Sequence, residues 1–191
     1  MKVSWEQLEN EIYNCEKCDR CRRRTNTVSG EGDPSAKVMF IGEGPGREED
    51  LQGRPFVGPS GELLDRMLRS IGLEREKVYI CNIVKCRPPG NRNPQPDEAL
   101  ACRDYLRAQV ALVRPRIIVL LGKVACRYTL GEDISMMRSH GEWRERKGVS
   151  FLPTFHPSFL LRSAEFKRAA WEDFQKLRER LREIEEADAN G

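Results

Sequence analysis

The chain has 191 residues, with 33 Lys or Arg against 30 Asp or Glu, which leaves a formal net charge of +3. So small a net charge excludes any argument from overall charge about nucleic acid, and the length suits one domain, residues 1–191, with a substantial core. The sequence shows no secretory signal and no apolar run near the roughly 20 residues of a membrane span, so we expect a cytoplasmic protein without membrane contacts.

In chain order, the first half of the sequence predicts helices and strands in alternation. Residues 4–13 have the spacing of an amphipathic helix, with a serine at the N-cap position. Residues 37–42 are continuously apolar, which is typical of a strand covered on both faces. Ser60 is expected to cap a helix that ends at Gly72, and residues 78–84 predict the next strand.

The second half continues this alternation. After a Pro- and Gly-rich loop, a helix is predicted over 97–113 and a further strand over 116–121. A short helix is expected over 124–128. Residues 131–148 are polar and irregular, and a hairpin is expected around Gly141.

The C-terminal part predicts a last strand over 149–155 and a long helix over 163–186, with residues 187–191 frayed. Strands alternating with helices predict an α/β fold, a three-layer αβα sandwich around a central four-stranded, mostly parallel sheet. A coiled-coil seam is the alternative for the long helix. Its apolar stripe covers only about three heptads, so packing against the sheet is favoured.

Polar groups directly follow several of the predicted strands. The turn Gly42–Gly46 follows one strand, Asn82 ends the next, and His156 follows the last. Because ligands bind beyond the carboxyl ends of parallel strands, we expect these groups to line one pocket. Pro45 lacks a backbone donor that a phosphate cradle would use, so the pocket suits an uncharged planar heterocycle better than a phosphate.

The chain contains 7 cysteines, and a reducing compartment favours metal ligation over disulfides for them. Cys15 and Cys18 form a C-x2-C pair, whereas Cys86 and Cys102 are more widely spaced. Thiolates at these positions could hold zinc or an iron–sulfur cluster, and the wide second pair favours the larger cluster. Cys21 is a spare ligand, because its spacing from Cys18 is equally valid.

Several stretches of the sequence resemble the motifs of one known family. They are Gly42–Asp50, Gly53–Gly61, Asn82–Pro94 and His156–Ser158. Together they resemble the family 4 uracil-DNA glycosylases, the iron–sulfur members of the uracil-DNA glycosylase superfamily. The resemblance implies a monofunctional glycosylase that hydrolyses the N-glycosidic bond of uracil in single- or double-stranded DNA, the first step of base excision repair of deaminated cytosine. It also implies a structural 4Fe–4S cluster held by Cys15, Cys18, Cys86 and Cys102.

The resemblance implies roles for the pocket residues as well. Gly42 and Glu43 would lie against the uracil, Phe56 would stack on it, and His156 would donate to its O2 atom. The carboxamide of Asn82 complements the O4 and N3–H of uracil, and cytosine would leave it mismatched at a cost of ~1–3 kcal/mol. Without the resemblance, a core plug is the alternative for Phe56 and a turn cap for Asn82.

Two features of catalysis stay open in the sequence. The ring of His156 could act as a neutral imidazole or as an imidazolium. The attacking water could be positioned by Glu43 or Asn91, which rank first as catalytic candidates beside His156, or by Glu49 or Asp50.

Two sets of residues are expected to contact DNA. Ser158, Leu160, Leu161 and Arg162 resemble the family's intercalation loop, in which apolar side chains wedge between base steps. An aliphatic turn buried under the last helix is the alternative for the leucines. The candidates for phosphate contacts are basic residues that could equally be solvated surface: Arg22, Arg23, Arg24, Lys85, Arg87 and Arg92.

Competing functions and partners complete the expectations. A superfamily member that binds uracil-DNA tightly without turnover is disfavoured, because residues 86–94 contain no histidine. A family 5-type glycosylase of broader base range is disfavoured by Glu43 and Asn82. We expect a monomer whose partner is uracil-containing DNA, and a sliding clamp is the candidate protein partner.

Overall fold

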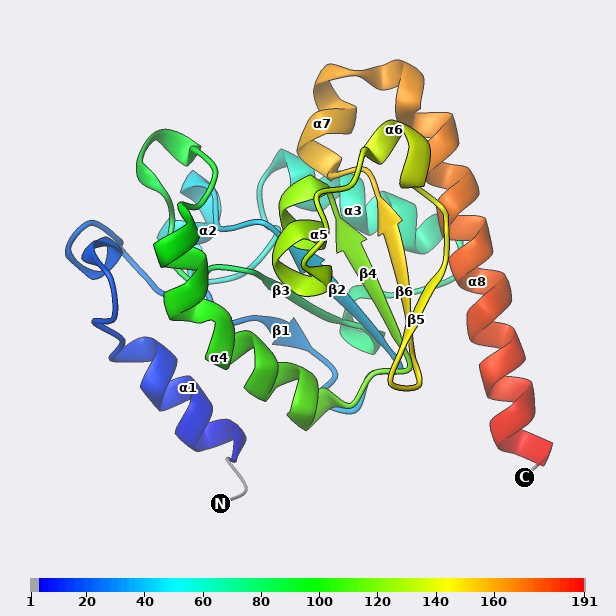
Figure 1. The fold of residues 1–191 in the computed structure, drawn as a ribbon, viewed down its shortest axis with the longest axis horizontal. Coiled ribbons are helices and arrows are strands. Elements are labelled where there is room, and N and C mark those ends of the chain that lie inside the picture. Colours follow the sequence, from blue (N-terminus) through cyan, green and yellow to red (C-terminus); the bar gives the residue numbers. More distant parts are fainter. Residues whose placement is uncertain (1–3, 191) are drawn as a thin grey trace.

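The computed structural model describes residues 4–190, with a six-stranded sheet at the centre (Figure 1). The strand order is β1-β3-β2-β4-β6-β5. The inner strands β3, β2, β4 and β6 are parallel, and the edge strands β1 and β5 are antiparallel to their neighbours. The strands are β1 Glu31–Gly32, β2 Val38–Gly42, β3 Tyr79–Asn82, β4 Ile117–Leu121, β5 Arg144–Arg146 and β6 Val149–Thr154.

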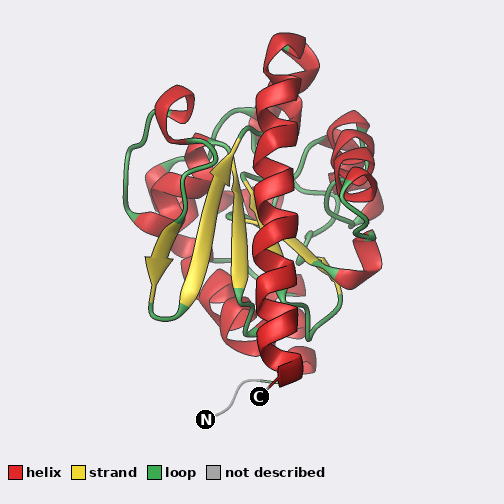
Figure 2. Ribbon diagram, turned by 90° about the vertical axis from the view of Figure 1, so that its right-hand side faces the viewer, coloured by secondary structure: helices red, strands yellow, loops and turns green. Residues whose placement is uncertain are grey.

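Helices cover both faces of this sheet, as Figures 1 and 2 show. One face packs against α4 and α5, and the other against α3 and α8. The predicted αβα sandwich is therefore confirmed. The helices are α1 Trp5–Tyr13, α2 Arg47–Gln52, α3 Pro59–Ser70, α4 Pro96–Val113, α5 Lys123–Leu130, α6 Met136–Ser139, α7 Pro157–Arg162 and α8 Lys167–Asn190.

The number of strands differs from the prediction. The four predicted strands form the parallel centre of the sheet, and nearly all of their residues are buried, as expected for strands covered on both faces. The edge strands β1 and β5 contain only 2 and 3 residues, too few to show any periodicity. Short edge strands also limit unwanted pairing with other chains.

Some turns and caps differ from the predictions as well. Ser4 caps α1 through a capping box with Gln7, as expected. Ser60, in contrast, lies inside α3, whose N-cap is Gly58. The hairpin joins β5 to β6 through Lys147 and Gly148 rather than around Gly141, because both of these residues adopt positive φ angles and form the tight turn.

The long helix extends through Asn190, and Gly191 lies outside the described residues, so the fraying expected for residues 187–191 stays a prediction. In the last turn of the helix, Asp188 pairs with Lys37 at 2.7 Å and with Arg116 at 3.3 Å. No helix within residues 4–190 has the length and apolar character of a membrane span.

Candidate active site and cysteine cluster

The carboxyl ends of the parallel strands open into one cavity. From β2 the chain first passes to β3 on one side and later to β4 on the other, which makes β2 the topological switch point of the sheet. The structure brings together there the groups that the sequence places at strand ends. The cavity has a volume of 260 Å³, and its lining includes Glu43, Phe56, Asn82, Asn91 and His156.

Asn82 presents an unpaired carboxamide oxygen to this cavity. The residue is 1% exposed, and its Oδ1 has no hydrogen-bond partner among residues 4–190. Its backbone carbonyl accepts a hydrogen bond from Lys85 Nζ at 2.7 Å, so the main chain is held while the side chain is free. A buried acceptor without a partner costs ~1–3 kcal/mol, which a ligand N–H facing Oδ1 would recover.

Phe56 lies next to the other side chains of the cavity. Its ring centroid is 5.7 Å from that of His156, and its backbone has a φ of 52°, which is strained for an aromatic residue. Gly42 makes this packing possible. A Cβ on Gly42 would lie 2.6 Å from Phe56 Cζ and 2.5 Å from Asn82 Oδ1, so any side chain there would displace both.

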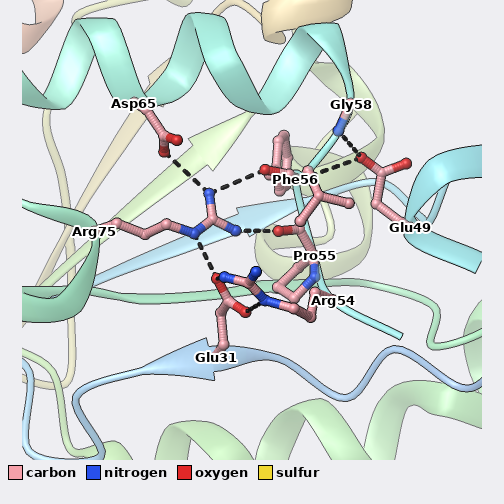
Figure 3. Close-up of polar contacts among 9 residues, drawn as sticks. Glu31, Glu49, Arg54, Pro55, Phe56, Gly58, Asp65 and Arg75 are labelled. Atoms are coloured by element: carbon pink, nitrogen blue, oxygen red, sulfur yellow. Dashed lines mark hydrogen bonds and ion pairs between the residues drawn. The ribbon is translucent and has the colours of Figure 1, made fainter. Parts of the chain in front are cut away.

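Arg75 holds the strained Phe56 loop from behind (Figure 3). Its Nη1 donates to the Phe56 carbonyl and to Asp65 Oδ1, both at 3.0 Å, and its Nη2 donates to the Pro55 carbonyl. Its Nε donates to Glu31. Sequence reasoning missed this residue, because its partners come from distant segments and form no local pattern.

Glu49 braces the same loop from the opposite side (Figure 3). Its Oε1 accepts from the backbone N–H groups of Val57 and Gly58, both at 3.0 Å, and its Oε2 accepts from Gly46 N–H at 3.0 Å. Asp50 is 4% exposed and accepts from Thr25 N–H at 2.9 Å. Both second-ranked candidates for positioning water are thus engaged by backbone amides.

The surroundings of His156 select a neutral imidazole. Its Nδ1 accepts the backbone N–H of Ser158 at 3.1 Å, so Nδ1 carries no proton and the tautomer has its proton on Nε2. Burial, and secondly the charge of Arg162, lower the pKa of His156 to about 4, although Glu49 acts in the opposite direction. At neutral pH the ring is therefore an uncharged donor through Nε2–H.

The two first-ranked candidates for positioning water both line the cavity. Burial raises the pKa of Glu43, and the charge of Arg20 opposes that shift. Asn91 has a φ of 57°, and its Oδ1 accepts from Arg87 Nε at 2.8 Å. That bond uses one lone pair of Asn91 Oδ1, and the Nδ2 amide group of Asn91 stays available to donate to a water.

Two of the predicted DNA contacts are wrong. Lys85 is 1% exposed, because its Nζ turns inward to the Asn82 carbonyl and to Gln109 Oε1 at 2.5 Å. Leu160 is fully buried and belongs to the apolar cluster beneath α7. Leu161, in contrast, is 42% exposed, as a wedge between bases requires.

The other predicted DNA contacts are accessible. Ser158 and Arg162 line the cavity, and Arg162 is exposed. Arg87 is half-buried through its bond with Asn91, whereas Arg22, Arg23 and Arg92 are exposed. Arg92 also pairs with Glu98 at 2.9 Å.

The N-terminal arm packs against α4 (Figure 1). Leu8 and Ile12 of α1 pack on Tyr105 of α4, and Cys15 lies against the same cluster. Tyr105 also donates to the Glu11 carbonyl at 3.3 Å. Because Cys102 is one helical turn before Tyr105, this packing places Cys15 and Cys102 in the same region.

Arg24 connects the two cysteine pairs. It donates to the Cys15 carbonyl at 2.8 Å and to Cys86 Sγ at 3.4 Å. Partial burial lowers the pKa of Arg24, but the hydrogen bond to Cys86 and the charges of Cys86, Cys15 and Cys21 outweigh it and raise the pKa. Cys21 lies on the 3-10 helix Asp19–Arg22, and its role as the spare ligand stays a prediction.

Cys86 and Cys102 are the buried members of the set. Burial raises the pKa of the Cys86 thiol to about 11, although Arg24 opposes this. Burial also raises the pKa of Cys102, and the neighbouring Lys85 lowers it.

The fold and the site together define the class of protein. Residues 29–175 match the model of the Uracil DNA glycosylase superfamily, to which the chain therefore belongs. It is 46% identical over 177 residues to the type-4 uracil-DNA glycosylase of Thermotoga maritima, which covers 90% of this chain and 91% of that protein. It is 44% identical over 185 residues to the type-4 enzyme of Sulfurisphaera tokodaii, which covers 92% of this chain and 84% of that protein. The chain is thus a member of the type-4 uracil-DNA glycosylase family, as the sequence motifs predict.

A type-5 relative is less similar. The type-5 uracil-DNA glycosylase of Pyrobaculum aerophilum is 32% identical over 190 residues, which covers 82% of this chain and 83% of that protein. The difference in identity favours type 4, in agreement with Glu43 and Asn82.

Proposed function

We propose that the protein is a monofunctional uracil-DNA glycosylase that hydrolyses the N-glycosidic bond of uracil in single- or double-stranded DNA. The observation that carries this proposal is the unpaired Oδ1 of Asn82, in the same cavity as the neutral ring of His156. The product, an abasic site, is the first intermediate of base excision repair of deaminated cytosine.

Asn82 selects the base in this proposal. Its Oδ1 accepts the N3–H of a flipped-out uracil, and its amide donates to O4. Cytosine has no N3–H and carries an amine at the other position, so it leaves both groups of a 1% exposed side chain mismatched. Phe56 stacks on the ring, and Gly42 lets the base approach this closely.

His156 stabilises the leaving group. When the bond between C1′ and N1 breaks, both electrons stay on the uracil, and negative charge gathers at O2. The Nε2–H of His156 donates to that oxygen, as a single oxyanion-hole donor does. One such donor lowers the activation free energy by ~3–4 kcal/mol. A water then forms the new bond to C1′, and its proton is released to the departing base or to solvent.

Glu43 and Asn91 position the attacking water. Both line the cavity, and burial raises the pKa of Glu43, which favours uptake of a proton from the water by its carboxylate. A covalent lyase route needs a lysine amine at the sugar. Among residues 4–190 the cavity lining includes no lysine, and Lys85 points away from it to Gln109, so hydrolysis is favoured.

Cys15, Cys18, Cys86 and Cys102 fit a 4Fe–4S cluster, which when bound would supply a structural link between the N-terminal arm and the loop after β3. Arg24 donates to Cys86 Sγ, and this contact favours the thiolate that a cluster ligand must be. Zinc is the alternative metal, and the wide spacing of Cys86 and Cys102 in the sequence favours the iron–sulfur cluster over it.

We propose that the protein acts as a monomer with residues 1–191 as one domain, built around a single sheet. Its DNA contacts include Ser158, Leu161, Arg162 and Arg87. A sliding clamp as partner and a cytoplasmic location stay predictions from the sequence.

The test is incubation of the purified protein with a uracil-containing oligonucleotide, followed by alkali. Strand scission at the uracil after alkali supports the proposal, and absence of scission would remove it. A shifted band that survives alkali would instead support the tight-binding alternative.

A further inference from the structure

A second cavity adjoins the uracil pocket. It has a volume of 390 Å³, and it shares Glu43, His156, Ser158 and Arg162 with the first. Its remaining walls come from the start of α5, from α6 and from α7, which gather at the carboxyl end of the sheet (Figure 1). The two cavities are therefore direct neighbours.

Part of the wall of this second cavity is apolar and contains aromatic side chains. Phe159 is stacked on Phe155, with ring centroids 5.6 Å apart and an interplanar angle of 19°. Met136 and Met137 complete the wall, and Met137 is 53% exposed. Aromatic faces bind nucleobases regardless of their identity, and thioethers adapt to flat partners. An exposed methionine in such a place is buried when a base covers it.

The rim of the second cavity is basic. Lys123 and Arg162 line it, and Glu43, in the wall shared with the uracil pocket, is its only carboxylate among the described lining residues. Lys123 pairs with Asp133 at 2.9 Å, but both side chains are more than half exposed, so the pair is weak and Lys123 can turn to a phosphate. Arg162 makes no ion pair with a carboxylate of residues 4–190. Cations beside an apolar platform are the arrangement that binds single-stranded nucleic acid.

We propose that this cavity binds the nucleotide next to the uracil in single-stranded DNA. Its base lies against Phe159 and Met137, and its phosphate lies between Lys123 and Arg162. The inference rests on the proposed function, since it places the neighbour of a uracil that occupies the first cavity. A single strand suits the site, because its bases leave the stack without breaking a pair.

The first measurement compares three single-stranded oligonucleotides. One has a normal base on each side of the uracil, and the others replace the 5′ or the 3′ neighbour by a base-free sugar analogue. Loss of one stacked base changes affinity by about tenfold or more. We expect kcat/KM to fall by that factor for one of the two base-free substrates, mainly through KM. Equal values for all three substrates would overturn the inference.

The second measurement uses Met137→Ala, with Leu100→Ala as the matched control. Leu100 is 56% exposed on α4 and does not line either cavity. Met137→Ala should lose about threefold or more in kcat/KM on the normal substrate, and lose nothing further on the sensitive base-free one. The control should behave like the unmodified protein on all three. An equal loss for Met137→Ala on every substrate would also contradict the inference.

Binding separates this inference from the proposed function. Oligonucleotides with a 2′-fluorinated deoxyuridine resist hydrolysis, and their affinity can be read by fluorescence anisotropy. The same pattern across the three neighbours is expected in binding as in turnover. If no substrate is hydrolysed but the pattern persists in binding, the proposed activity fails and the nucleotide site stands.

Discussion

Replacing Arg75 by Gln should uncouple the Phe56 loop from the rest of the fold. Arg75 donates to the carbonyls of Pro55 and Phe56, and its side chain is only 13% exposed. Hydrogen bonds from a charged group are worth ~1.5–3 kcal/mol each, so removing these two lowers the free energy of unfolding by about 3–6 kcal/mol. For a chain of this size that corresponds to a decrease of about 6–24 °C in Tm.

The same change should lower activity at temperatures where the variant is folded. The φ of 52° at Phe56 is a strained conformation that costs ~1–3 kcal/mol and persists only while its surroundings hold it. Without Arg75 the loop relaxes, and the Phe56 ring is no longer held in the position where it stacks on uracil. We expect kcat/KM on uracil-DNA to fall about tenfold or more, with a clear increase in KM.

Arg54→Gln is the matched control for this prediction. Arg54 pairs with the same carboxylate, Glu31, at 2.8 Å, but it is 58% exposed and, among residues 4–190, its hydrogen bonds go to Glu31 and not to the carbonyls of Pro55 and Phe56. Exposed ion pairs contribute ~0–1 kcal/mol, so its variant should keep nearly full stability and activity.

A double variant decides whether Arg75 acts through Phe56. In a Phe56→Ala background, Arg75→Gln should still lower Tm but should change kcat/KM very little further. A full additional loss of kcat/KM in that background would refute the reasoning. So would an Arg75→Gln enzyme with normal kcat/KM well below its Tm.

Three further predictions concern the pocket and the cluster. Asn82→Asp should reduce the preference for uracil over cytosine by about tenfold or more, read as the ratio of the two kcat/KM values, and an unchanged ratio would contradict the role of the carboxamide. His156 has its pKa lowered to about 4 in the folded state, so the unfolded chain binds more protons between pH 4 and about 6.5. The free energy of unfolding should therefore decrease as pH falls through that window, and His156→Asn should flatten the decrease in denaturant titrations. Cys86→Ala should lose the brown iron–sulfur absorbance and much of the thermal stability, and full colour with an unchanged Tm would show that the ligand assignment is wrong.

The parallel centre of the sheet could be predicted because strands that are buried on both faces have mostly apolar sequences. Asn82 and His156 could be predicted for a related reason, since each stands where such a sequence stops. The edge strands could not, because Glu31–Gly32 and Arg144–Arg146 are too short to show a period. Their pairing depends on neighbours that are distant in the sequence.

The errors at Lys85 and Leu160 have a common physical origin. A sequence shows that a side chain is charged or apolar, but the direction in which it points depends on tertiary packing. Lys85 turns inward because the Asn82 carbonyl and Gln109 accept its protons. Leu160 and Leu161 are adjacent on α7, so the helical turn sends one into the core and the other to solvent.

The ion pairs of Asp188 have a practical consequence for handling the protein. Lys37 and Arg116 stand just before β2 and β4, so they fasten the last turn of α8 to the amino ends of the strands. The uracil pocket opens at the other end of the sheet, at the carboxyl ends of the parallel strands. A fluorophore, affinity tag or surface tether joined after that turn should leave the approach of DNA unobstructed.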